Sequence, residues 1–388
     1  MNQVSKGLEG VVAAETRLSM VDGEAGELVI AGFPVVELAG HASFEETAWL
    51  LWSDHLPDAD SLRALGAQLR AARALPPITE QVVADAASHK VGAMTALRMA
   101  AATVPVHVDT KPLIGGIAPE DWGTAIRLFA SFPTIVASYA RLVGGKKPIA
   151  PRLDLDHAAN FLYMLTGEVP GENRVRGLQT YLNTVVDHGL NASTFTARVI
   201  VSTGSDFVSA ITGAVGALKG PLHGGAPGPA LDMVFAIGSA QNAEPWLRRH
   251  IESGERLMGF GHRIYKVRDP RADVLAAAAE RMYTTGGDMA LYKLARSVEQ
   301  TALRLLEEYK PGRKLQTNVE YYTALLLHGL GLPSDLFTPV FAISRVVGWL
   351  AHGFEQRTAG RLIRPQSIYS GPRDRRWVPL EQRVLAAR

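Results

Sequence analysis

Most of this chain repeats apolar residues at helical spacing, and glycines and prolines interrupt the repeat at intervals. The pattern extends from His41 to Phe354. No strand pattern alternates with it, which excludes the parallel sheet of an α/β protein. Only the N-terminal part favours strands, because Thr16–Val21 and Glu27–Ile30 flank an Asp-Gly turn. The sequence therefore predicts an all-α protein with a small N-terminal β-hairpin.

Local chemistry indicates where several helices begin and end. Ser43-Phe-Glu-Glu46 is a capping box that opens a helix to Trp52. Asp269-Pro270 supplies a cap and a first-turn proline for another helix. Further helices are expected from Leu62 to the Pro76-Pro77 stop and over 121–142, 154–165, 174–218, 291–309, 323–330 and 338–354. Within these ranges we expect a kink or break at Pro133, interruptions at 187–191 and Gly204, and an extended basic tail from Gly360.

Composition narrows the class of protein further. The 388 residues are 47% hydrophobic and 20% charged, enough to bury a large core. The net charge of +2 argues against a general nucleic-acid binder, and the absence of cysteine excludes disulfides and thiolate chemistry. The first residues lack the apolar core of a signal peptide, and no uninterrupted apolar run reaches the roughly 18–20 residues of a membrane span. We expect a cytoplasmic protein with no membrane or nucleic-acid partner.

One stretch, Leu257–Arg271, combines a titratable ring with dense positive charge. His262 follows the turn Gly259-Phe-Gly261, and four cations, Arg263, Lys266, Arg268 and Arg271, follow it. Histidine exchanges protons near neutral pH, and arginine matches carboxylates and phosphates. The stretch indicates either an anion site with proton chemistry or a solvated basic helix start.

Several common motifs are missing. Gly259-Phe-Gly261 lacks the third glycine of a dinucleotide fingerprint, and no Walker-type Gly-Lys-Ser/Thr occurs. The 11 histidines include no close metal-binding pair, so we expect no dedicated metal site. Leu222-His-Gly-Gly-Ala226 is similar to an esterase oxyanion loop, but the Gly-x-Ser-x-Gly elbow that such enzymes need is absent. Three histidines at glycine breaks, His188, His223 and His262, remain as candidates for function.

Several segments, in their order along the chain, resemble the citrate synthase family in its shorter bacterial and archaeal type. The segments are the N-terminal Gly7–Val11 with the hairpin, Asp187–Phe195, Gly220–Ala226, Gly259–His262 with Asp269–Arg271, Asn318–Glu320, and Phe341–Arg345 through Arg364–Ser367. The resemblance covers nearly the whole chain. It implies a two-domain multi-helical fold, with a large domain over 1–224 and 332–388 for dimerisation and oxaloacetate. The small domain, 225–331, would bind CoA and close over the site.

The resemblance also implies a reaction and a site. The family condenses acetyl-CoA with oxaloacetate and hydrolyses the product to citrate and CoA. Glu320 would remove a methyl proton, His223 would stabilise the enolate and His262 would polarise the ketone. Oxaloacetate would be bound by His188, Arg271, Arg345 and, from the partner of a homodimer, Arg364, while Lys266, Arg313 and Lys314 are candidates for the CoA phosphates. No metal or redox cofactor is implied, since acetyl-CoA is a co-substrate.

Glu320 departs from the family pattern, which has aspartate there. Glutamate is one methylene longer, and a displacement of about 1 Å can cost roughly a hundredfold in rate. Our leading hypothesis is a citrate synthase in which Glu320 acts as the base. The alternatives are a 2-methylcitrate synthase that uses propionyl-CoA, because one methyl is worth only about 1–3 kcal/mol in a pocket, and a catalytically weak ligand-binding paralogue.

Overall fold

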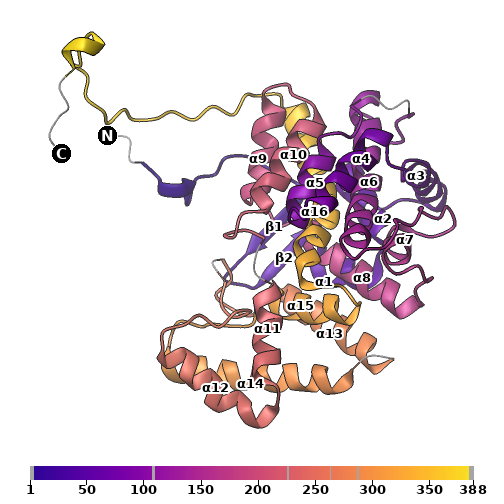
Figure 1. The fold of residues 1–388 in the computed structure, drawn as a ribbon, viewed down its shortest axis with the longest axis vertical. Helices are drawn as coiled ribbons and strands as arrows, with labels where there is room; N and C mark the ends of the chain where they lie inside the picture. The colour runs from indigo at the N-terminus through magenta and orange to yellow at the C-terminus, as the bar shows by residue number, and fades with distance from the viewer. Residues whose placement is uncertain (1–3, 107–109, 225–226, 263, 286–287, 384–388) are drawn as a thin grey trace. The chain divides into compact units, whose positions relative to one another are not determined.

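The structure is a computed structural model that describes residues 4–106, 110–224, 227–262, 264–285 and 288–383. The chain separates into two units. The larger, called the body here, is Thr16–Leu362, and the smaller combines the terminal segments Met1–Glu15 and Ile363–Arg388. The described residues form 16 α-helices and one small sheet, which confirms the predicted fold class (Figure 1).

The sheet is antiparallel and lies near the N-terminus. Its strands, in the order β1-β2-β3, are β1 (Ser19–Asp22), β2 (Glu27–Ile30) and β3 (Phe33–Pro34). Ser19 pairs with Ile30 and Asp22 with Glu27, so the predicted hairpin is confirmed. Asp22 Oδ1 accepts the backbone N–H groups of Glu24 and Ala25, which stabilises the turn. The sequence pattern did not predict β3, because two residues are too few to show an alternation.

Ten helices precede the segment that carries His223: α1 (Val35–His41), α2 (Phe44–Ser53), α3 (Ala59–Ala71), α4 (Pro77–Ser88), α5 (Ala93–Ala101), α6 (Pro119–Val143), α7 (His157–Thr166), α8 (Glu172–Val185), α9 (Ala192–Ser202) and α10 (Phe207–Leu218). Six follow it: α11 (Pro227–Ile237), α12 (Ala240–Glu252), α13 (Pro270–Thr284), α14 (Met289–Tyr309), α15 (Val319–Gly329) and α16 (Phe337–Ala359). Figure 1 shows α11 to α15 gathered at one end of the body.

The structure confirms the helix ends that were predicted from capping residues. Ser43 and Glu46 form both hydrogen bonds of the capping box at the start of α2. Asp269 caps α13 with Pro270 in its first turn, and Gly167 ends α7 in the left-handed conformation. The expected interruptions separate α8, α9 and α10.

Three expectations about helix boundaries are wrong. Pro133 lies inside a helix, α6, that continues to Val143, so the proline does not break the helix. Pro133 is buried, and tertiary packing there offsets the lost backbone hydrogen bond. Pro77 begins α4, as a proline in the first turn can, although the sequence suggested only a stop. α15 begins at Val319, ahead of the expected Thr323, because the Asn318 side chain caps it.

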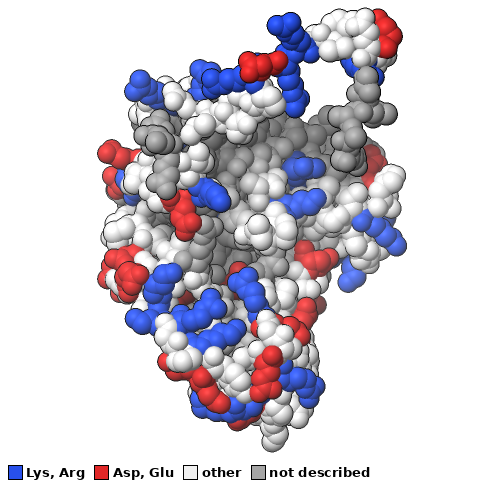
Figure 2. Space-filling model, turned by 90° about the vertical axis from the view of Figure 1, so that its left-hand side faces the viewer, with Lys and Arg blue, Asp and Glu red and all other residues white. Residues whose placement is uncertain are grey.

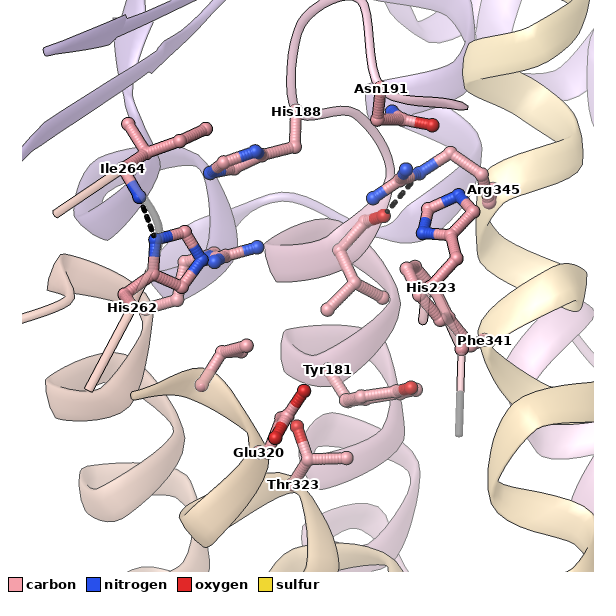
Figure 3. Close-up of a pocket in the computed structure, with 14 residues that line it drawn as sticks. Tyr181, His188, Asn191, His223, His262, Ile264, Glu320, Thr323, Phe341 and Arg345 are labelled. Carbon is pink, nitrogen blue, oxygen red and sulfur yellow. Dashed lines mark hydrogen bonds between the residues drawn. The ribbon is translucent and has the colours of Figure 1, made fainter. Parts of the chain in front are cut away.

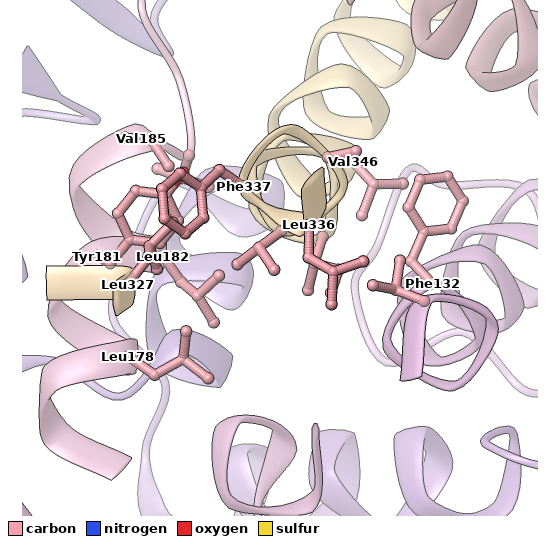
Figure 4. Packing of buried hydrophobic residues seen from close by; sticks show 14 of the residues in the cluster. Phe132, Leu178, Tyr181, Leu182, Val185, Leu327, Leu336, Phe337 and Val346 are labelled. Carbon is pink, nitrogen blue, oxygen red and sulfur yellow. The ribbon is translucent and has the colours of Figure 1, made fainter. Parts of the chain in front are cut away.

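The core of the body surrounds α16. Trp349 and Val346 on this helix are fully buried, and α16 packs against α6, α8, α9 and α10 (Figure 4). At Gly348, α16 passes so close to the turn after α8 that a Cβ would overlap the carbonyl oxygen of Val186. The missing side chain therefore lets α16 lie directly against the residues that lead into His188.

α6 is long and apolar enough to cross a membrane by length and composition alone. Within the body, 72% of its most apolar window is buried by the rest of the chain. Its apolar surface is therefore used in the core, as in the central helix of a multi-helical protein.

Candidate active site

Most of the predicted site residues meet at one cavity of the body, with a volume of about 240 Å³. The polar side chains that line it include His188, His223, His262, Arg271, Glu320 and Arg345. Figure 3 shows the labelled histidines, Glu320 and Arg345 arranged around a central space, from segments far apart in the sequence. Six of the seven residues predicted for catalysis and oxaloacetate binding are thus brought together.

His262 is held as a neutral hydrogen-bond donor. Its Nδ1 accepts the backbone N–H groups of Ile264 and Tyr265, both at 3.1 Å. Because a backbone N–H can only donate, the ring proton lies on Nε2. Burial, followed by the nearby charge of Arg271, lowers the pKa of His262 to about 4. At neutral pH the ring therefore offers Nε2–H without carrying a charge.

His223 has the opposite tautomer. The backbone N–H of Ser193 lies 3.4 Å from Nε2, and the Ser193 hydroxyl lies 2.8 Å from the same atom. The ring proton therefore lies on Nδ1. Trp349 Nε1 donates to the Ser193 hydroxyl at 3.0 Å, which ties this support to the core helix α16. Burial and then the charge of Arg345 lower the pKa of His223 to about 4.

His188 follows the turn after α8 and faces His262. The two ring centroids are 6.0 Å apart, and Nε2 of His188 lies 3.1 Å from the hydroxyl of Tyr265. Burial, then the charges of Arg271 and Arg345, hold the pKa of His188 well below its usual range. His188 is therefore also neutral.

Two buried guanidinium groups make the cavity positive. Arg271 is 5% exposed, and Asp269 engages its Nε and Nη2 at 3.0 and 2.8 Å. Arg345 is 1% exposed, and its Nε donates to the carbonyl of Val185 at 2.9 Å. Burial lowers the pKa of Arg345 to about 10, against the stabilising charge of Asp187. Buried cations at a cavity wall favour an anionic ligand, since a partner of opposite charge offsets their loss of hydration.

Glu320 lies in the first turn of α15, where Asn318 holds it next to the His262 segment. Asn318 Oδ1 accepts the Glu320 N–H at 3.0 Å, and its Nδ2 donates to the carbonyl of Gly261 at 2.8 Å. Burial raises the pKa of the Glu320 carboxyl above 4.5, and Asp269 adds to this, while Arg271 opposes it. A raised pKa makes the carboxylate a stronger base.

A second cavity, of about 660 Å³, adjoins the first. His223, His262 and Glu320 line both cavities. Its wall carries the cations Arg256, Lys310 and Arg313 beside the carboxylates of Glu255 and Glu320. Figure 2 shows Lys and Arg side chains interspersed with Asp and Glu side chains on the lower part of one face, which belongs to the end of the body that holds α11 to α15. The three acid–base residues lie where the two cavities, each with cations on its wall, meet.

The residues predicted to bind the CoA phosphates differ in their position relative to the second cavity. Arg313 lines the second cavity, whereas Lys266 and Lys314 are exposed and are not among its described lining residues. Arg256 and Lys310 line it but lie in no recognisable motif, so only their general positive charge could have suggested them. Arg364 belongs to the unit of the terminal segments, so its role stays a prediction, and Arg263 lies outside the described residues.

The arrangement is that of an acid–base site for anionic substrates, with one carboxylate and two neutral imidazoles between two cationic cavities.

Residues 7–366 match the family described as citrate synthase, C-terminal domain. Citrate synthase 2 of Bacillus subtilis is 41% identical over 384 residues, which cover 98% of this chain and 99% of that protein. The 2-methylcitrate synthase of Mycobacterium tuberculosis is 38% identical over 388 residues, covering 98% and 92%.

A solved structure is similar over the whole chain. It is the ternary complex of carboxymethyl coenzyme A and oxaloacetate with citrate synthase from Thermoplasma acidophilum, which is 30% identical, with a TM-score of 0.87. The match covers 99% of this chain and 100% of that one. The chain belongs to the citrate synthase family.

The low pKa of His262 predicts a loss of stability in acid. The unfolded ring binds a proton near its ordinary pKa of 6.5, whereas the folded ring binds one only near pH 4. The unfolded state therefore holds more protons in this window, and stability falls as the pH is lowered through it. We expect the melting temperature of a His262→Gln variant to fall less steeply between pH 6.5 and 4 than that of the wild type.

Calorimetric melting curves across this pH range measure the two slopes. His41→Gln, a change at an exposed histidine, is the control and should follow the wild type. Equal slopes for His262→Gln and the wild type would contradict the assigned burial of the ring.

Proposed function

We propose that this protein condenses acetyl-CoA with oxaloacetate and hydrolyses the resulting thioester to citrate and CoA. The observation that carries the proposal is that His223, His262 and Glu320 line both cavities. A condensation needs its acid and base groups at the point where two substrates meet. The family membership agrees with this reaction.

Glu320 begins the reaction in this scheme. Its carboxylate takes a proton from the methyl group next to the thioester carbonyl. Nδ1–H of His223 donates to the thioester oxygen, which develops negative charge as the enolate forms. A neutral imidazole suits this step, because its proton stays on the ring while the charge builds on the substrate.

His262 prepares the other substrate. Its Nε2–H donates to the ketone oxygen of oxaloacetate, which makes the ketone carbon more electrophilic. The enolate carbon attacks this carbon, and a C–C bond forms while the ketone oxygen becomes an alkoxide. The alkoxide takes the proton of His262 Nε2–H, and the proton that Glu320 removed from the methyl group restores the His262 ring. Hydrolysis of the thioester then releases citrate and CoA.

The positively charged residues of the two cavities would bind different substrates. His188, Arg271 and Arg345 would bind the two carboxylates of oxaloacetate in the smaller cavity. Arg256, Lys310 and Arg313 would face the phosphates of CoA in the larger one. The Thermoplasma acidophilum structure, a ternary complex with carboxymethyl coenzyme A and oxaloacetate, supports this division.

The proposed domains are those implied by the resemblance: a large domain of 1–224 and 332–388, and a small domain of 225–331 that closes on CoA. Residue 225, the first boundary, lies outside the described residues. Closure would exclude water from the enolate. We also propose a cytoplasmic location, in keeping with the mostly buried α6.

We further propose a homodimer in which Arg364 completes the oxaloacetate site of the partner subunit. Large apolar side chains of the C-terminal segment are exposed in the single chain: Ile368, Tyr369, Trp377 and Leu380. A partner subunit would cover them, since apolar side chains gathered on a surface favour association.

Propionyl-CoA is the alternative acyl substrate, favoured by the 38% identity to a 2-methylcitrate synthase. We expect release of free CoA thiol from acetyl-CoA with oxaloacetate to exceed release from propionyl-CoA. The kcat/KM values for the two acyl-CoAs measure the preference, and assays without oxaloacetate serve as controls for simple thioester hydrolysis. Predominant activity with propionyl-CoA would support the alternative, and no activity with either would support a ligand-binding paralogue.

Replacing the proposed base should remove most of the activity. We expect Glu320→Gln to lower kcat by about 100- to 10,000-fold, the usual contribution of a general base, while the Tm shift caused by oxaloacetate persists. Steady-state kinetics and melting curves measure the two effects. Glu307→Gln, at an exposed position on α14, is the control. Wild-type condensation rates in Glu320→Gln would show that another group is the base.

Mixed dimers test whether Arg364 acts across subunits. Glu320→Gln and Arg364→Ala should each be inactive or weak. When equal amounts are dissociated and reassociated, about half of the dimers are mixed, and each has one intact site, so about a quarter of the wild-type activity should return. If Arg364 serves its own subunit, no mixed dimer has an intact site and activity stays low. Size-exclusion chromatography with light scattering must show that both variants remain dimers.

A further inference from the structure

The β1–β2 hairpin is hydrogen-bonded to the turn that carries His188. The hydroxyl of Ser19 on β1 donates to Asp187 Oδ2 at 2.5 Å and accepts the backbone N–H of Gly189 at 2.7 Å. These two residues flank His188 on either side. Asp187 is fully buried, and His352 of α16 holds its Oδ2 at 3.2 Å. The hairpin and the His188 turn are therefore joined by partly buried hydrogen bonds on both sides of the histidine.

The other end of the hairpin touches the His262 segment. The backbone N–H of Lys266 donates to the carbonyl of Gly23 at 2.8 Å. A Cβ at Gly23 would overlap the carbonyl oxygen of Ile264. Gly23 does not have the positive φ that would itself demand glycine. The close approach to Ile264 is thus the constraint that a side chain at this position would violate.

The contacts close into a circuit around the first cavity. Beyond the hairpin turn, the N–H groups of Ile264 and Tyr265 hold Nδ1 of His262. The hydroxyl of Tyr265 lies 3.1 Å from Nε2 of His188. The chain of contacts therefore leads from the His188 turn through Ser19 and Gly23 to the His262 segment, and back to His188. Each link restrains the separation of the two imidazoles.

We propose that the turn of the β1–β2 hairpin, through Gly23, is a positioning element of the oxaloacetate site. It holds the His262 segment at the distance from His188 at which both rings reach one small dicarboxylate. The inference rests on the proposed function for the identity of that ligand. The contact also crosses the proposed domain boundary, since Gly23 lies in 1–224 and Ile264 in 225–331. The hairpin can therefore hold the His262 segment only when the two proposed domains lie together.

A single added methyl group tests the proposal. In Gly23→Ala we expect the KM for oxaloacetate to rise about tenfold, because a shift well below 1 Å at His262 weakens carbonyl and carboxylate contacts. The KM for acetyl-CoA should rise less than the KM for oxaloacetate, because no residue of the hairpin turn lines the second cavity, which shares only His262 with the displaced contact. The Tm shift produced by oxaloacetate alone should shrink. Gly40→Ala in α1, where an added Cβ meets nothing within 4 Å, is the matched control and should behave as the wild type.

Two further variants address the other links of the circuit. Ser19→Ala removes the hydroxyl that joins β1 to the His188 turn, and Tyr265→Phe removes the hydroxyl that faces His188. Both should show the same selective rise in the KM for oxaloacetate. If Gly23→Ala fails to fold, the KM for oxaloacetate in these two variants tests the positioning role. A lowered Tm with unchanged KM for oxaloacetate in the folded variants would overturn the positioning role and leave the hairpin purely structural.

The outcomes separate this inference from the proposed function. If the wild type condenses neither acyl-CoA, the proposed function fails, and the Tm shift with oxaloacetate still reports on the hairpin. If the wild type is active and Gly23→Ala matches Gly40→Ala in every measurement, only the positioning role is lost.

Discussion

The site depends first on the close passage of α16 over the turn that follows α8. Gly348 removes the side chain that would collide with Val186, and the helix lies against this turn. One turn of helix earlier, Arg345 then reaches the carbonyl of Val185, which aims its guanidinium at the cavity. The same helix supports His223 through Trp349 and Ser193. Contacts along one face of α16 thus help to bring Arg345, His188 and His223 to one cavity.

Burial and positive charge then define the chemistry of the histidines. Desolvation and the neighbouring arginines lower the pKa values of His223 and His262 to about 4, so both are neutral donors. The same desolvation raises the pKa of Glu320 and increases its basicity. Burial and positive charge therefore produce two uncharged acids, and burial, against the opposing charge of Arg271, produces one stronger base. At neutral pH, His223, His262 and Glu320 need not gain or lose a proton to reach these states, so the site is preorganised before the substrates bind.

Much of the fold could be predicted because it follows local rules. The capping box at Ser43 and the Asp269-Pro270 start of α13 depend on neighbours within a few residues. The continuation of α6 through Pro133 was mispredicted because burial of the proline is not visible in a window of adjacent residues. The start of α15 was mispredicted although its signal is local: Asn318 caps the helix through the N–H of Glu320, and the prediction relied on apolar spacing alone.

The sequence by itself determined the helical class, the hairpin and the types of residue needed for acid–base chemistry on anions, since these depend on periodicity, turn chemistry and side-chain identity. Only the tertiary structure decided which nitrogen of His223 carries the proton, because the partner of this ring comes from α9, 30 residues away. It also decided that Arg256 and Lys310 line the second cavity, where Lys266 and Lys314 had been expected. A positive charge can be read from one residue, but its place at a cavity is set by the packing of distant segments.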